Sequence, residues 1–105
     1  MATVTSKVLS RTAAAVTSTT LYTVPTTSTT TVVTNVLVAN TAASAATFDM
    51  SIDGVQIAND VAIAANDTLS IDMKQVIPAN ATPKIIVGLA SAITVNFHIS
   101  GVEIV

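Results

Sequence analysis

Residues with a branched Cβ dominate this sequence and constrain its fold more than any other feature. Thr, Val and Ile account for 43 of the 105 residues, and good helix formers other than Ala are scarce. A branched side chain loses rotamer freedom in a helix but packs well on the pleated surface of a strand. The Ala-rich stretches at 13–15, 42–46 and 62–65 are short and lie among Thr, Ser and Asn. The sequence therefore predicts an all-β chain.

Apolar and polar residues alternate with period two in several segments, which is typical of strands with one buried face. We expect about eight short strands, and hence an antiparallel β-sandwich that is jelly-roll-like. The segment 85–89 is expected to be buried on both faces or to lie at a subunit contact. Gly101 is expected to mark a bulge or turn. The segments with strand character are 3–9, 21–24, 32–39, 47–53, 55–57, 61–63, 68–73, 85–89, 93–100 and 102–105.

The strongest local signal is a hairpin centred on Asp53-Gly54. Glycine tolerates the positive φ of a type I′ turn, which joins antiparallel strands in two residues. Met50 and Ile52 precede the turn at alternate positions, and Val55 and Ile57 follow it. In a regular hairpin these four side chains share one face, so all four are predicted to point into the core.

The chain has the length of a single domain. We divide it into an N-terminal strand or arm, residues 1–20, that contacts a neighbour, and a β-sandwich domain, residues 21–105. Residues 17–31 are low in complexity, since 11 of the 15 are Ser or Thr. Such a segment forms either a mucin-like stalk or two strand edges around a proline turn. The second interpretation is favoured, because Leu21, Tyr22 and Val24 supply apolar anchors.

The sequence contains no complete catalytic or metal-binding motif. Residues 49–60 match part of a calcium-loop pattern, but that loop needs flanking helices, and a hairpin explains the same residues. His98 is the single histidine and falls on the polar side of its strand, which predicts a surface position. The chain has no Cys, no nucleophile elbow and no phosphate-binding loop. We therefore expect no enzyme activity, no cofactor and no metal.

Charge and hydropathy exclude two classes of partner. Only ten residues are charged and the net charge is −2, which disfavours nucleic-acid binding by a basic surface. The apolar runs are far shorter than the ~20 residues of a membrane-spanning helix, and three aromatic residues cannot form the girdles of a membrane barrel. No secretory h-region is visible at the N-terminus. We therefore expect synthesis in a cytoplasm and no membrane partner.

The low charge instead favours burial against other proteins. Soluble domains carry about 25% charged residues, whereas this chain carries 10%. Since interface cores are depleted in charge, we expect a permanent homo-oligomer or a component of a larger shell. The N-terminal 20 residues hold Lys7 and Arg11, half of the cations. Lys7, Arg11 and Tyr22 are the candidate subunit or capsid contacts.

One resemblance to a known group of proteins is visible between about residues 20 and 75. The stretches that carry it are Leu21-Tyr22-Thr23-Val24-Pro25, residues 32–38, Asn40-Thr41, residues 44–48 and residues 63–69. Their order and spacing resemble those of small tailed-bacteriophage virion structural proteins. The resemblance implies a β-sandwich that is a virion component, either a capsid cement (decoration) protein or a tail, baseplate or fibre accessory.

Two functional hypotheses follow from that resemblance. In the first, the chain is a cement protein on the outer surface of a phage head, with the major capsid protein and copies of itself as partners. Its pI near 4.8 favours the outer face, because DNA phosphates would repel an acidic protein. In the second, it binds a receptor or carbohydrate in the tail. Sugar sites need exposed aromatic rings, and the alternation assigns Phe48 and Phe97 to the core. The short Asp53-Gly54 hairpin also argues against a receptor-binding loop at that position.

Overall fold

The structure, a computed structural model, describes residues 3–26 and 29–105. Within these ranges it contains eight strands and no helix, so no helix there could span a membrane. The all-β prediction is thus confirmed. The strands are β1 (Val4–Ala13), β2 (Thr19–Thr23), β3 (Thr30–Asn40), β4 (Ala46–Ile52), β5 (Val55–Ile63), β6 (Thr68–Ile77), β7 (Ile85–Ala90) and β8 (Val95–Ile104).

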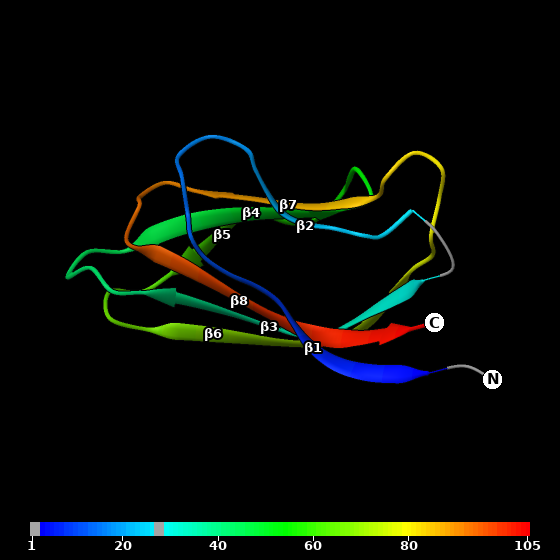
Figure 1. The fold of residues 1–105 in the computed structure, drawn as a ribbon. Helices are drawn as coiled ribbons and strands as arrows, with labels where there is room; N and C mark the ends of the chain where they lie inside the picture. The colour runs from blue at the N-terminus through cyan, green and yellow to red at the C-terminus, as the bar shows by residue number, and fades with distance from the viewer. Residues whose placement is uncertain (1–2, 27–28) are drawn as a thin grey trace.

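The strands form two four-stranded antiparallel sheets that pack face to face (Figure 1). Sheet A has the order β1-β8-β3-β6 and sheet B the order β2-β7-β4-β5. Strand β1 pairs with β8, β2 with β7, β3 with β6 and β4 with β5. The chain is therefore a long antiparallel hairpin, closed at the β4–β5 turn and folded over on itself. This is the jelly-roll arrangement, as the alternation and strand spacing predicted.

The core lies between the two sheets and is built from their inward-facing alternate residues. Phe48 of β4 and Phe97 of β8 meet edge to face at its centre, with ring centroids 6.0 Å apart and an interplanar angle of 72°. Strand β3 is central in sheet A and the longest strand of the described chain. Its residues Val33, Val36 and Val38 are fully buried. The buried faces agree with the predicted alternation for Phe48, Met50 and Ile52 in β4 and for Val95, Phe97 and Ile99 in β8.

The Asp53-Gly54 turn is present and Val55 pairs with Ile52 as predicted, but the core positions predicted for Val55 and Ile57 are wrong. Asp53 and Gly54 have φ values of +54° and +78°, as a type I′ turn requires. Beyond the turn, Met50 pairs with Ala58 rather than with Ile57, because Ile57 is an extra residue in β5. Val55 is 68% exposed and Ile57 is 42% exposed. The bulge moves Ala58 into the core in place of Ile57.

A second bulge follows in β5 and explains the calcium-like pattern. Between Ala58 and Val61 the strand again has one residue more than its partner β4. Asp60 takes a φ of +50° there, and its N–H donates to Asp49 Oδ1 at 2.6 Å. The predicted short strand 61–63 is thus the end of one long, twice-bulged edge strand. Asp49 caps a backbone irregularity in that strand.

Three other sequence predictions change in detail. Ile93 lies outside the core in the turn before β8 and is 70% exposed. Strand β7 is fully buried on one face, and Ile85, Val87 and Leu89 are half-buried on the other, so burial on both faces is wrong and a subunit contact there stays a prediction. Gly101 lies within β8, and the extra residues near it belong to β1 and β3.

The N-terminal segment is part of the sandwich. Strand β1 runs to Ala13, beyond the predicted end at residue 9, and pairs with β8 along its length. Contact of residues 1–20 with a neighbour stays a prediction. Strand β2 and the start of β3 lie in the Ser/Thr-rich segment 17–31, as the second interpretation expected, although Thr27 and Ser28 lie outside the described residues.

Candidate functional site

Two of the three candidate contact residues meet at one end of the sandwich, together with Glu103. Lys7 Nζ lies 3.0 Å from Glu103 Oε1, and the Tyr22 hydroxyl donates a hydrogen bond to Glu103 Oε2. The Lys7 ammonium also lies 5.9 Å from the centroid of the Tyr22 ring. We call this trio the Glu103 cluster. It joins β1 and β8 of sheet A to β2 of sheet B.

The strand register explains why a charged residue lies at this position. Val95, Phe97, Ile99 and Gly101 are the buried alternate residues of β8, and Glu103 is next on the same face. The Glu103 side chain is 14% exposed, whereas that of Lys7 is 45% exposed. The cluster therefore closes the open end of the core with groups that satisfy one another. Such mutual pairing gives a structural contact and leaves no free nucleophile or base.

The pKa values in the cluster shift in the directions that this pairing predicts. The hydrogen bond from Tyr22 lowers the pKa of Glu103, partial burial opposes that effect, and Lys7 adds to it. Burial, followed by the bond to Glu103, raises the pKa of Tyr22. The hydrogen bond to Glu103 raises the pKa of Lys7. At neutral pH the trio is an ion pair with a neutral phenol.

Acid titration of Glu103 should depend on its hydrogen bond from Tyr22. A lowered folded-state pKa stabilises the fold fully above the unfolded value of about 4.3, and this stabilisation is lost as pH falls through the folded pKa. Tyr22→Phe removes the largest cause, so we expect a higher Glu103 pKa and acid unfolding that begins at higher pH. Glu103 is the single glutamate, so a selective carbon label resolves it by NMR. Lys7→Met is the matched variant, since Lys7 also lowers this pKa, and an unchanged Glu103 pKa in Tyr22→Phe would contradict this assignment.

Arg11 does not join the Glu103 cluster. It is exposed on β1, beyond the bulge at Leu9, and its Cα partner on β8 is His98. His98 is also exposed, as predicted, and pairs with Leu37 of β3 on its other side. Arg11 thus lies on the outer face of sheet A, separated along β1 from Lys7.

The outer face of sheet A has an apolar area near the chain ends. We call it the valine face, and its members are Val4, Val8, Val32, Val76, Val102 and Ile104. Val102 pairs with Val32, and Val32 with Val76, so these side chains lie in one row across three strands. Val4 and Val76 are 62% and 63% exposed. Soluble sandwiches normally place polar residues on outward positions, so such a row predicts an interaction surface.

A shallow hollow of about 390 Å³ opens in the valine face beside Gly101. It lies where β1 and β3 each carry an extra residue, Leu9 and Thr34. Its lining is uncharged except for Lys7 at one side. The residues around it are Ser6, Lys7, Val8, Thr34, Ser100, Gly101 and Val102. The hollow makes the valine face concave, which suits a protruding apolar group better than a flat one.

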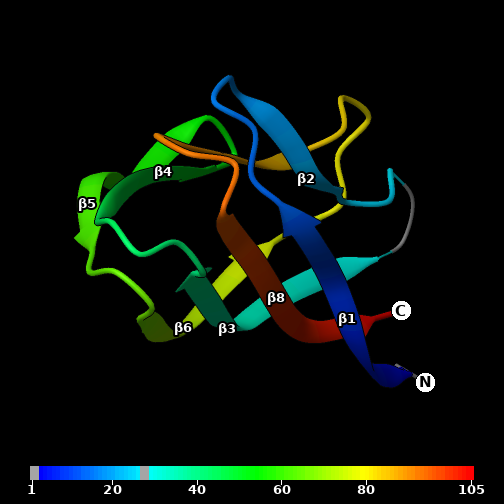
Figure 2. The same cartoon turned by 90° about the vertical axis from the view of Figure 1, so that its left-hand side faces the viewer.

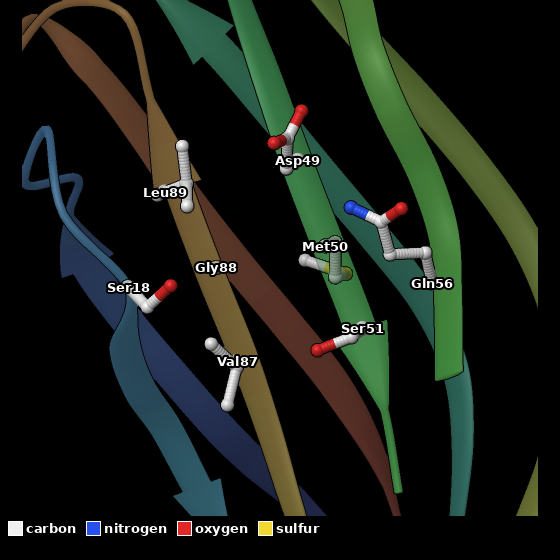
Figure 3. A pocket seen from close by; sticks show the side chains of 8 residues that line it. All are labelled: Ser18, Asp49, Met50, Ser51, Gln56, Val87, Gly88 and Leu89. Carbon is white, nitrogen blue, oxygen red and sulfur yellow. The ribbon is translucent and has the colours of Figure 1, made fainter. Parts of the chain in front are cut away.

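A second hollow, of about 60 Å³, lies on the outer face of sheet B (Figure 3). Asp49 and Ser51 of β4, Val87 and Leu89 of β7, and Gln56 of β5 surround it. It is much smaller than the 300–1,000 Å³ of ordinary ligand pockets. The lining lacks an aromatic ring for a sugar to stack on. Its chemistry therefore does not favour the carbohydrate-binding hypothesis.

Other titratable groups of the described chain do not gather into a centre. In residues 3–26 and 29–105, no three His, Cys, Asp or Glu side chains are placed to hold a metal ion. Sequence reasoning missed Glu103, although a lone glutamate between Val102 and Ile104 was a signal for it. It also missed Asn40, whose buried amide connects three loops.

Comparison with known proteins adds little to this geometry. No protein-family model matches the chain, and no curated protein matches it in sequence. Among solved structures, a chain in the structure of infectious bursal disease virus, Gx strain, is similar over 99% of this chain, with a TM-score of 0.47 and 12% identity. The matched part is 31% of that chain. At that score and identity the similarity carries no argument for function.

Proposed function

We propose that this protein is a non-enzymatic structural component of a viral particle. Within that class we propose a capsid cement protein on the outer surface of a tailed-phage head. The observation that carries the proposal is the valine face, an apolar surface on the outward side of a jelly roll. The resemblance of residues 20–75 to phage virion proteins supports the same class. The function is then the burial of apolar surface against the major capsid protein and neighbouring copies.

The valine face of one molecule is smaller than a standard protein–protein contact. The valine face is four strands wide, at a spacing of about 4.8 Å, and about six residues long, at a rise of ~3.4 Å per residue. Its area is therefore ~400 Å². A stable protein contact buries about 800 Å² on each partner. The valine face of one molecule thus supplies about half of a standard contact. A second surface or a second copy is needed for the rest.

The copy number in purified virions tests the proposed location. A cement protein is present in hundreds of copies, in a fixed ratio to the major capsid protein, which quantitative mass spectrometry measures. A few to a few dozen copies would contradict the cement assignment and favour a tail, baseplate or fibre accessory. A protein absent from particles would contradict both.

A charge placed on the valine face should abolish binding to the shell. Val76→Glu puts an unpaired carboxylate into the proposed contact, where its desolvation is unfavourable. We expect at least a tenfold loss of affinity, about 1.4 kcal/mol, in co-sedimentation with capsids that lack the protein. Val55→Glu is the matched control, because Val55 is equally exposed but lies in the β4–β5 hairpin. Equal binding by the two variants would show that the valine face is not the contact.

A further inference from the structure

Strand β1 forms a free edge of sheet A (Figure 2) and carries Val4 and Val8 of the valine face. The backbone groups of Thr3 and Val105 exchange two hydrogen bonds, of 2.8 and 2.9 Å. In an antiparallel ladder, such pairs alternate with pairs whose backbone groups point the other way. Thr3, Thr5 and Lys7 therefore bond to β8. The N–H and C=O groups of Val4, Ser6 and Val8 point away from it.

The other three sheet edges are protected, whereas this part of β1 is not. Strand β5 has two bulges, and β6 has an irregular pairing and two charged residues, Asp72 and Lys74. Strand β2 has five residues and is followed by Pro25. Bulges, charges, short strands and prolines are the usual devices against edge pairing. In β1 the bulge comes only at Leu9, so residues 3–8 are regular. Lys7 is the one charged residue among them, and its ammonium group is held by Glu103 of the neighbouring strand β8.

We propose that a second copy of this chain adds its β1 to this edge, antiparallel, about a twofold axis at Ser6. In this register Ser6 faces Ser6, and Val4 of each copy faces Val8 of the other. The backbone N–H and C=O groups of these residues point away from β8, towards the second copy. The three pairs, one of Ser6 with Ser6 and two of Val4 with Val8, therefore exchange about six hydrogen bonds. Thr5 then faces Lys7, and no like charges are opposed. The two sheets A become one eight-stranded sheet.

The side chains select this register over its neighbours. An axis at Lys7 would place two ammonium groups directly opposite each other, which is unfavourable. An axis at Thr5 would pair Val4 with Ser6 and separate the valines. With the axis at Ser6, the row Val76-Val32-Val102-Ser6 continues into the same row of the second copy. The valine face is thereby doubled to ~800 Å², the area of a stable contact.

This inference deepens the proposed function. The pairing of two β1 strands does not depend on that function, but binding of the doubled valine face to a capsid does. The pairing itself is tested on the isolated protein by sedimentation velocity. We expect the wild type to be dimeric at micromolar concentrations. Ser6→Lys and Ser6→Glu should each be monomeric, because like charges then meet on the axis. A one-to-one mixture of the two variants should dimerise again, since opposite charges meet there.

The controls separate edge pairing from a loss of folding. The Ser6 amide does not bond to β8, so both variants should retain the wild-type melting temperature within a few degrees. Arg11→Glu changes a charge on the same strand outside the paired residues and should stay dimeric. Ser6→Cys, in a chain without other cysteines, should form an intermolecular disulfide on oxidation.

Three results would overturn the pairing: a monomeric wild type, dimers in either single Ser6 variant, or no restoration on mixing. A monomeric protein that still occurs in hundreds of copies in virions would overturn the pairing and leave the proposed function intact. A dimer with the expected variant pattern but few copies in virions would support the pairing and overturn the proposed cement function.

Discussion

Gly101→Ala should destabilise the protein more than alanine at either other glycine. A Cβ at this position would lie 2.2 Å from the backbone oxygen of Val32 and 3.0 Å from Leu9 Cδ1. The Val32 carbonyl belongs to β3, which is held by ladders to β8 on one side and to β6 on the other. The backbone therefore cannot move aside at low cost. We expect a loss of about 3 kcal/mol, at the upper end for overpacked cores, and a melting temperature lower by more than about 10 °C.

The other two glycines provide matched controls for this prediction. At Gly54 nothing lies within 4 Å of an added Cβ, so Gly54→Ala is opposed only by the φ of +78°, which costs about 1–2 kcal/mol. At Gly88 the nearest atom is Leu21 Cδ1, at 2.7 Å, on a side chain that can rotate. Calorimetry should therefore place Gly101→Ala lowest in stability. Equal losses for Gly101→Ala and Gly54→Ala would show that β3 can yield.

Asn40→Asp should produce the second large loss, through a single buried amide. Asn40 is 2% exposed, and its Nδ2 donates to Ser44 O at 2.8 Å, with Ala64 O and Ile63 O at 3.3 and 3.4 Å. Its Oδ1 accepts from the Ala42 N–H and the Thr94 hydroxyl. A carboxylate would face these carbonyl oxygens without a proton to donate. We expect a loss of about 3 kcal/mol at neutral pH, as for a buried network that loses its donor.

The pH dependence distinguishes this cause from a simple packing defect. The carbonyl oxygens disfavour the charged form, so the folded-state pKa of the new carboxyl is raised above its unfolded value of about 3.9. The penalty is therefore present at neutral pH and is relieved as pH falls towards the unfolded value. Denaturant titrations at pH 7 and pH 5 should show Asn40→Asp regaining stability relative to the wild type. Asn80→Asp is the control, because the Asn80 side chain is exposed and its oxygen accepts from Thr82 N–H.

The register of the strands was predictable only where the pleat is regular. The alternation around Phe48 and Phe97 gave the correct buried face, because each apolar residue stands two positions from the next. It failed at Ile57, since an extra residue in β5 exchanges the two faces. Nothing local marks that bulge: it depends on how the edge strand fits against β4.

The candidate site was likewise predictable only in part: the sequence indicates two of its residues but not the contact between them. Lys7 and Tyr22 stand out in the sequence because cations and aromatic residues are rare in this chain. Their contact partner, Glu103, is 96 residues from Lys7 and 81 from Tyr22. Only the closing of β1 on β8, and of sheet B over sheet A, brings the three together. Arg11 had equal standing in the sequence but lies beyond the Leu9 bulge, away from the cluster.

The sequence by itself determined that this chain is an all-β sandwich. Branched Cβ atoms and period-two alternation favour strands through interactions between residues that are close in the sequence, so these signals can be read without the tertiary structure. The tertiary structure decided which outward residues lie together. The six residues of the valine face come from four strands, and nothing in the sequence distinguishes them from the other apolar residues: they are Val4, Val8, Val32, Val76, Val102 and Ile104. They form one surface only because antiparallel pairing places the two terminal strands, β1 and β8, side by side and joins β8 to β3, which in turn pairs with β6. Long-range strand order is set by packing of the whole core, so the valine face could not be inferred from any one segment.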